Sequence, residues 1–214
     1  MSAENYYNDL SEKYDELTKN HWSAPTNVFQ QSHFFDGKKK GLIIGIGTGQ
    51  DVSSFLNANI SDITGIDISQ KMIEICEEKF SKIKLYCSDF NNNHFYSSDK
   101  YDAIICSGVS EFIEDIESLI SKISSLSEKN GVLIFSFEPI IHDHPHQKHA
   151  SSSSKSLSGN GSQSIELITY RRQPELIQDL FKKYNFSLLH QTSFSSYKKS
   201  DIDVVYNQYI LSKN

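Results

Sequence analysis

The stretch that decides the fold is Gly41-Leu-Ile-Ile-Gly-Ile-Gly-Thr-Gly49. Its apolar run, Leu42–Ile46, is too short for a helix and is ended by glycines, so it predicts a buried strand. The glycines permit a tight turn in which a ligand can approach the backbone. Val52, Phe55 and Leu56 follow at helical spacing. The turn therefore leads into the N-terminus of a helix, where free amides attract negative groups.

Short apolar runs and helical patterns alternate along the rest of the chain. Further strands are predicted at 63–68, 83–87, 101–106, 131–137, 186–194 and 202–211, and helices at 5–19, 25–35, 72–80, 116–123 and 174–184. We expect Ser69 to cap the third of these helices. The short polar link Ser195–Ser200 predicts that the last two strands pair antiparallel. This order predicts an α/β fold with a seven-stranded, mostly parallel sheet and helices on both faces.

The length of 214 residues predicts one domain. We expect a helical cap at 1–37, a core at 38–140, a flexible loop at 141–165, and a closing helix and strand pair at 166–214. The loop is predicted from its composition, because several histidines are followed by a stretch rich in Ser, Gly and Asn.

Charge and composition exclude several classes of function. The chain has 21 basic and 27 acidic residues, a net charge of -6, and it lacks a long basic stripe, which argues against nucleic-acid binding. Its apolar runs fall short of the ~18 residues of a membrane span, and acids near Met1 argue against a signal peptide. Cys76, Cys87 and Cys106 lack metal-site spacing. We expect buried free thiols and a cytoplasmic protein.

Two acids follow predicted strands in the way that nucleotide-binding folds use. Asp67 ends the second strand, where a carboxylate can accept both hydroxyls of a ribose. It could instead be an acid that stabilises a helix N-terminus. Asp89 ends the third strand and Phe90 follows it, so the pair could hold an adenine, or be a loop acid and a core aromatic ring. The combination with the glycine turn is more specific than any one of these residues.

Two common phosphate-binding motifs do not fit the glycine turn. A dinucleotide fingerprint would place its third glycine one position later, where Gln50 stands. A P-loop would need Gly-Lys-Ser/Thr, which does not occur here. A nicotinamide-dependent reductase is therefore disfavoured and stays as an alternative.

Five runs, in order, resemble motifs of the class I S-adenosylmethionine-dependent methyltransferases. They are the runs at 41–49, 63–72, 86–90, 101–109 and 131–137. The resemblance implies a Rossmann-like fold, S-adenosylmethionine as cofactor, and methyl transfer by in-line displacement to a small-molecule acceptor. The motifs do not identify the acceptor.

The resemblance also implies which residues hold the cofactor. Asp67 would hold the ribose, Asp89 the adenine amino group, and Ser107 would lie under the methionine end. Tyr14 of the helical cap could touch the cofactor or serve in packing. The other implied cofactor-binding residues lie at strand ends and are Gly45, Gly47, Thr48, Gly49, Ile68 and Phe90.

The chain departs from this family at one position. Ile43 stands two places before the first motif glycine, where relatives usually carry Asp or Glu that helps hold the methionine amino group. The departure motivates an alternative function, that of a catalytically silent cofactor-binding or assembly protein on the same fold.

The acceptor side of the site is less well marked in the sequence. Methyl transfer needs mainly positioning, and a base only if the acceptor must lose a proton. Of the histidines in 142–149 we expect His142 and His144 to be the catalytic candidates, since histidine titrates near neutrality. A solvated loop and a metal site are the alternatives, and we expect no metal. Arg171 or Arg172 could pair with an acidic acceptor, or lie on the surface.

Overall fold

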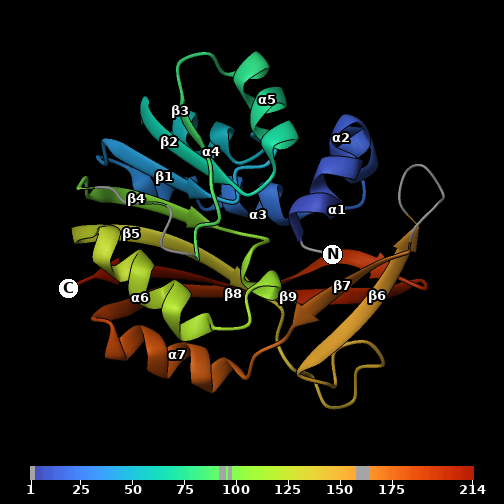
Figure 1. The fold of residues 1–214 in the computed structure, drawn as a ribbon. Coiled ribbons are helices and arrows are strands. Elements are labelled where there is room, and N and C mark those ends of the chain that lie inside the picture. The colour runs from blue at the N-terminus through green and yellow to red at the C-terminus, as the bar shows by residue number, and fades with distance from the viewer. Residues whose placement is uncertain (1–2, 92–94, 96–97, 158–163) are drawn as a thin grey trace.

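A mixed seven-stranded sheet forms the centre of the molecule, and helices cover both of its faces (Figure 1). The computed structural model describes residues 3–91, 95, 98–157 and 164–214. The sheet has the order β3-β2-β1-β4-β5-β9-β8, in which β9 runs antiparallel to both β5 and β8. Its strands are β1 (Lys40–Ile44), β2 (Asp62–Asp67), β3 (Lys84–Cys87), β4 (Tyr101–Cys106), β5 (Ser127–Phe137), β8 (Phe186–Lys199) and β9 (Ile202–Lys213). The predicted Rossmann-like sheet is confirmed.

Alternate side chains of the central strands enter two separate cores. Leu42 and Ile44 of β1 pack on the face covered by α6 (Ile116–Leu126) and α7 (Pro174–Lys183). Ile43 points to the other face, where α3 (Ala24–Gln30), α4 (Val52–Asn57) and α5 (Gln70–Lys79) lie. Because Ile43 is fully buried among apolar side chains, an acid at this position would face the core.

The N-terminal segment forms a helical cap over one end of the sheet. It consists of α1 (Ala3–Leu10), the 3-10 turn η1 (Ser11–Lys13), α2 (Tyr14–Thr18), α3 and a second 3-10 turn, η2 (Ser32–Phe35). The predicted helix at 5–19 is thus broken into shorter pieces. Ser69 caps α5 as expected, because its hydroxyl accepts a hydrogen bond of 3.2 Å from the amide of Met72.

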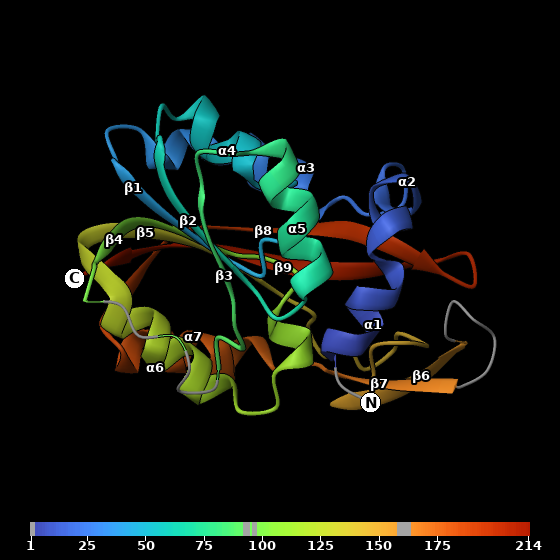
Figure 2. The same cartoon turned by 45° about the horizontal axis from the view of Figure 1, so that its top comes forward.

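The segment after β5 differs from the prediction. Strands β6 (Ser151–Leu157) and β7 (Ser164–Tyr170) form a separate two-stranded antiparallel sheet beside α1, so the flexible loop predicted over 141–165 is wrong for these residues (Figures 1 and 2). The serine-rich composition of β6 does not indicate a strand, because the apolar residues of this pair belong mostly to β7. Part of the predicted loop, 158–163, lies outside the described residues. β7 also contacts the 3-10 turn η3 (Ser110–Phe112), which follows β4.

Two further expectations need correction. Cys76 and Cys106 are buried, but Cys87 is exposed, because it belongs to the edge strand β3. The predicted link Ser195–Ser200 is also wrong, since β8 continues to Lys199.

Among the helices of the described chain, none is both long and apolar enough to cross a bilayer.

The turn between β8 and β9 is two residues long. Lys199 pairs with Ile202, and the turn residues Ser200 and Asp201 have φ values of 50° and 62°. Positive φ at both positions is the geometry of a type I′ hairpin turn, which favours Asn-Gly.

We expect the double substitution Ser200→Asn and Asp201→Gly to raise the free energy of unfolding by about 1 kcal/mol, because it relieves left-handed strain in the folded state. Urea denaturation would measure the change. The matched variant Ser200→Val should be destabilised, since a β-branched side chain opposes positive φ. Equal stability of all three proteins would contradict this account of the turn.

Candidate functional site

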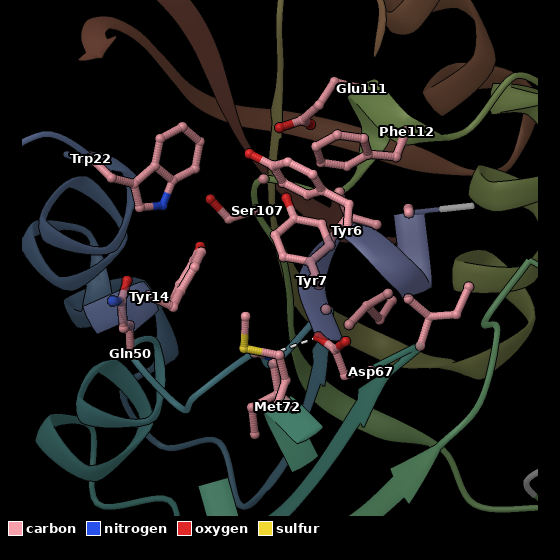
Figure 3. A pocket seen from close by; sticks show the side chains of 18 of the residues that line it. Tyr6, Tyr7, Tyr14, Trp22, Gln50, Asp67, Met72, Ser107, Glu111 and Phe112 are labelled. Carbon is pink, nitrogen blue, oxygen red and sulfur yellow. Dashed lines mark hydrogen bonds between the residues drawn. The ribbon is translucent and has the colours of Figure 1, made fainter. Parts of the chain in front are cut away.

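A cavity of about 700 Å³ lies at the carboxyl ends of the parallel strands, beneath the helical cap (Figure 3). The ligand edge of an open α/β sheet lies there, because loops from neighbouring strands meet at one end. The structure brings most of the predicted cofactor-binding residues to this cavity. Those that line it are Tyr14, Gly45, Gly47, Thr48, Asp67, Ile68, Asp89, Phe90 and Ser107.

Gly49 is the predicted cofactor residue that does not line the cavity. Its φ is 92°, and a Cβ there would come within 2.6 Å of the Phe80 ring. Gly49 therefore serves the close packing of the turn against α5. Gly47, with φ of 53°, is different, because a Cβ there would meet no atom within 4 Å. The open space beside Gly47 belongs to the cavity.

Asp67 connects the glycine turn to the start of α5. Its Oδ2 accepts a 2.8 Å hydrogen bond from the amide of Gly47, and its Oδ1 accepts another of 2.8 Å from the amide of Ser69. Burial raises the pKa of Asp67, and these backbone hydrogen bonds oppose that rise. Each oxygen keeps a further acceptor site, so the carboxylate can also bind ligand hydroxyls.

Asp15 fastens the cap to the glycine turn and was missed by the sequence analysis. Its Oδ1 accepts hydrogen bonds from the Thr48 hydroxyl, at 2.5 Å, and from the Gln50 amide, at 3.1 Å. Its other oxygen forms an ion pair with Lys79 of α5. Partial burial alone would raise the pKa of Asp15, but the hydrogen bonds from Lys79, Thr48 and Gln50 hold it below its usual range.

Asp51 is a second acid that the sequence analysis missed. It lines the cavity at the N-cap position of α4, where its side chain makes no capping hydrogen bond. It is only 8% exposed, and its Oδ1 has no hydrogen-bond partner. Burial raises the pKa of Asp51 to about 7. A buried carboxylate with an unpartnered oxygen beside a cavity is suited to hold a cation.

The part of the cavity away from Asp67 is lined by aromatic side chains. Figure 3 shows the rings of Tyr6, Tyr7 and Phe112 between Asp67 at one end of the view and Glu111 at the other. The full aromatic set comes from the cap, η3 and the last two strands, and consists of Tyr6, Tyr7, Tyr14, Trp22, Phe112, Tyr197 and Tyr206. The added hairpin contributes Leu167 and Thr169 to the same wall. The helical spacing of Tyr7 and Tyr14 was the sequence pattern that could have indicated this aromatic wall.

Glu111 is the buried acid of this aromatic chamber. Its Oε1 accepts a 2.8 Å hydrogen bond from the Tyr206 hydroxyl, while its Oε2 has no hydrogen-bond partner. The residue is 3% exposed, and burial raises its pKa to about 7. An acid inside the short apolar run after the fourth strand could have drawn attention to it.

Comparison with known proteins finds a family model that matches part of the chain. Residues 42–135 match a family model described as a methyltransferase domain. A protein of Haemophilus influenzae is 31% identical over 107 residues, which cover 47% of this chain and 42% of that protein. An uncharacterised methyltransferase of Schizosaccharomyces pombe is 32% identical over 111 residues, covering 45% and 38%. The chain spans about two fifths of the length of these curated relatives.

The fold likeness extends over the whole chain. A crystal structure of an S-adenosylmethionine-dependent methyltransferase from Clostridium acetobutylicum matches with a TM-score of 0.72 at 17% identity, covering 98% of this chain and 99% of that one. The chain therefore has the fold of this solved methyltransferase.

The predicted catalytic histidines, His142 and His144, do not line the cavity. His142 is exposed. The Nε2 of His144 donates to the carbonyl of Asp203 at 2.8 Å, and its Nδ1 accepts from the amide of His146 at 3.2 Å. Both ring nitrogens of His144 are therefore occupied by backbone groups. The described residues hold no group of three or more His, Cys, Asp or Glu side chains that could bind a metal ion.

The two arginines before α7 are buried and serve the architecture, so neither the acceptor role nor the surface position considered for them fits. The Nε of Arg171 donates to Glu138 Oε1 at 2.5 Å, and both side chains are almost fully buried. The Nη2 of Arg172 donates to the carbonyls of Ile113, at 2.6 Å, and Glu114, at 3.0 Å. Arg172 thereby holds the segment that follows η3.

The two cavity acids predict an unusual pH dependence of stability. Burial moves the pKa of Asp51 from 3.8 to about 7 and that of Glu111 from 4.5 to about 7. At pH values between the ordinary pKa of each acid and its raised pKa, the folded protein binds more protons than the unfolded chain. The contribution of the two acids to stability is therefore present at low pH and is lost as pH rises toward 7 and above.

We expect Glu111→Gln to raise the free energy of unfolding at pH 8 by about 1–3 kcal/mol, because a neutral amide removes the cost of a buried charge. At pH 5, where the wild-type carboxyl is protonated, the difference should be small. Urea denaturation at both pH values would measure it. A variant that is less stable than wild type at pH 8 would contradict the burial of an unpaired charge.

Proposed function

We propose that the protein binds S-adenosylmethionine at the ends of β1, β2 and β3 and transfers its methyl group to a small-molecule acceptor held in the aromatic chamber. The observation that carries the proposal is the single cavity of about 700 Å³, which joins the glycine turn and Asp67 to the aromatic side chains of the cap. Two reactants can therefore lie in contact within one enclosed space, which is the main requirement of methyl transfer.

The residues of the cavity suit the parts of the cofactor. The free space at Gly47 admits a ligand against the backbone. Asp67 has acceptor capacity for the ribose hydroxyls, and Asp89 with Phe90 offers an acceptor and a ring for the adenine. Ile68 and Ser107 line the same space.

Asp51 can take the place of the acid that is missing at position 43. Ile43 faces the apolar core, so that position cannot serve the methionine amino group. Asp51 lines the cavity instead, and one of its carboxylate oxygens has no hydrogen-bond partner. A positively charged amino group would compensate the cost of burying that charge. We assign the amino-group contact to Asp51, which weakens the case for a silent protein.

The remaining task of the chain is positioning. When bound, the cofactor supplies an electrophilic methyl group for in-line displacement. The cap covers the cavity and limits the access of water, while Asp15 fixes its position on the glycine turn through Thr48 and Gln50. Rings around the chamber hold the acceptor by its apolar surface.

Calorimetric titration with S-adenosylmethionine and with S-adenosylhomocysteine tests the proposed function. We expect micromolar binding of both, and a loss of at least tenfold in affinity for Asp67→Ala, which removes a charge-assisted hydrogen-bond acceptor. Absence of binding by the wild type would refute the cofactor assignment. Cofactor binding without turnover in a cell extract would favour the silent alternative, and binding of NAD(P)H instead would favour the reductase.

Asp51→Asn tests the amino-group contact separately. We expect at least a tenfold loss of affinity for S-adenosylhomocysteine, because the neutral amide cannot compensate an ammonium charge. Asp115→Asn is the matched control, since Asp115 is an exposed N-cap residue of α6 outside the cavity. Equal affinity of the two variants would remove Asp51 from the cofactor site.

A further inference from the structure

Glu111 distinguishes the aromatic chamber from a merely apolar pocket. Tyr206 from β9 fixes one carboxylate oxygen, and the other oxygen is left without a partner in the cavity wall. A buried polar atom without a partner destabilises the fold, and more so when it is charged. Such a cost is typical of a site that is completed by a ligand.

The rings of the aromatic chamber form two groups, and the rings within each group are in contact. Trp22 packs edge-on against Tyr206 at 5.5 Å between centroids, and Tyr197 lies 6.3 Å from Tyr206. On the other side, Tyr7 packs edge-on against Phe112 at 5.6 Å. Aromatic faces attract cations and repel anions. A cation that reaches Glu111 is therefore favoured by both the acid and the rings.

The charges near Glu111 favour the same kind of ligand. The other charged groups of the cavity are mostly acids, while its basic side chains, His21 and Lys199, are exposed. The Oε1 of Glu138 is paired with Arg171, which compensates the charge of Glu138. The titratable groups whose charges interact with Glu111 are Tyr7, Tyr14, Cys106, Glu138, Tyr197 and Tyr206. A carboxylate or phosphate acceptor would meet like charge here.

We propose that the methyl acceptor is a small amine whose nitrogen binds the free oxygen of Glu111 and whose apolar part lies among the aromatic rings. This inference rests on the proposed function and names its substrate class. It also replaces the predicted histidine base by Glu111.

Proton and electron movements balance in this arrangement. The amine enters as an ammonium ion and gives one proton to Glu111 Oε2, which frees the nitrogen lone pair. That lone pair forms the bond to the methyl carbon while the carbon–sulfur bond breaks and its electrons stay on sulfur. The methylated amine leaves with a positive charge, and Glu111 returns its proton to water. An acid with a pKa of about 7 can perform both steps at neutral pH.

Binding of 2-phenylethylamine to the protein loaded with S-adenosylhomocysteine tests the proposal without relying on turnover. Trp22, the only tryptophan of the chain, lines the chamber, so its fluorescence reports occupancy. We expect saturable binding of the amine and at least tenfold weaker binding of 2-phenylethanol, which has no positive charge. Amine affinity should fall as pH decreases through 7, because Glu111 becomes protonated.

Glu111→Gln should reduce amine affinity at least tenfold, abolish its pH dependence and leave the affinity for S-adenosylhomocysteine unchanged. Glu114→Gln is the matched control, because it removes an equal charge from an exposed position three residues away and should bind like wild type. The proposal is overturned if the loaded wild type prefers the alcohol or binds neither probe, or if Glu111→Gln keeps its amine affinity. Weaker S-adenosylhomocysteine binding by Glu111→Gln would assign Glu111 to the cofactor instead.

The two proposals fail in different ways. If the wild-type protein binds neither S-adenosylmethionine nor S-adenosylhomocysteine, the proposed function fails before any amine is added. If it binds them and the amine results are negative, methyl transfer stands and only the acceptor class is wrong.

Discussion

The carboxylate of Asp67 is the group on which the geometry of the proposed ligand site depends. It accepts hydrogen bonds from Gly47 in the turn after β1 and from Ser69 at the start of α5, so two loops are fixed by one side chain. The geometry is available because β1 and β2 are parallel neighbours whose carboxyl ends meet at one edge. The glycine turn then presents open backbone, and the cap closes over it through Asp15.

Burial of charge divides the cavity into two functional parts. Asp51 lies with the cofactor-binding turn and Glu111 with the aromatic chamber, and each keeps one oxygen without a partner. Both acids oppose folding near neutral pH, because the folded environment disfavours their charged forms. Residues that cost stability at the edge of a cavity are commonly functional, and two positively charged ligands would compensate this pair.

The β6–β7 hairpin is an addition to the seven-stranded central sheet. Strands β6 and β7 extend the segment between β5 and α7, and β7 contacts both η3 and α1. Arg171 and Arg172 hold the base of this addition through Glu138 and the carbonyls after η3. These contacts position the loop that carries Glu111. The histidines after β5 lie outside the cavity and contribute backbone-directed hydrogen bonds.

The sequence by itself determined the sheet, its order of elements and the glycine turn at the edge where we propose the cofactor binds. Local periodicity and the glycine turn sufficed, because the apolar runs of buried strands and the conformational demands of glycine are local properties. Only the tertiary structure decided the acceptor side. Of the three acids that the sequence did not mark, Asp15 and Glu111 bond to partners up to 95 residues away and Asp51 is buried by tertiary packing, while the serine-rich strand β6 pairs with β7. Burial and unpaired oxygens arise when distant segments pack together, so no local pattern announces them.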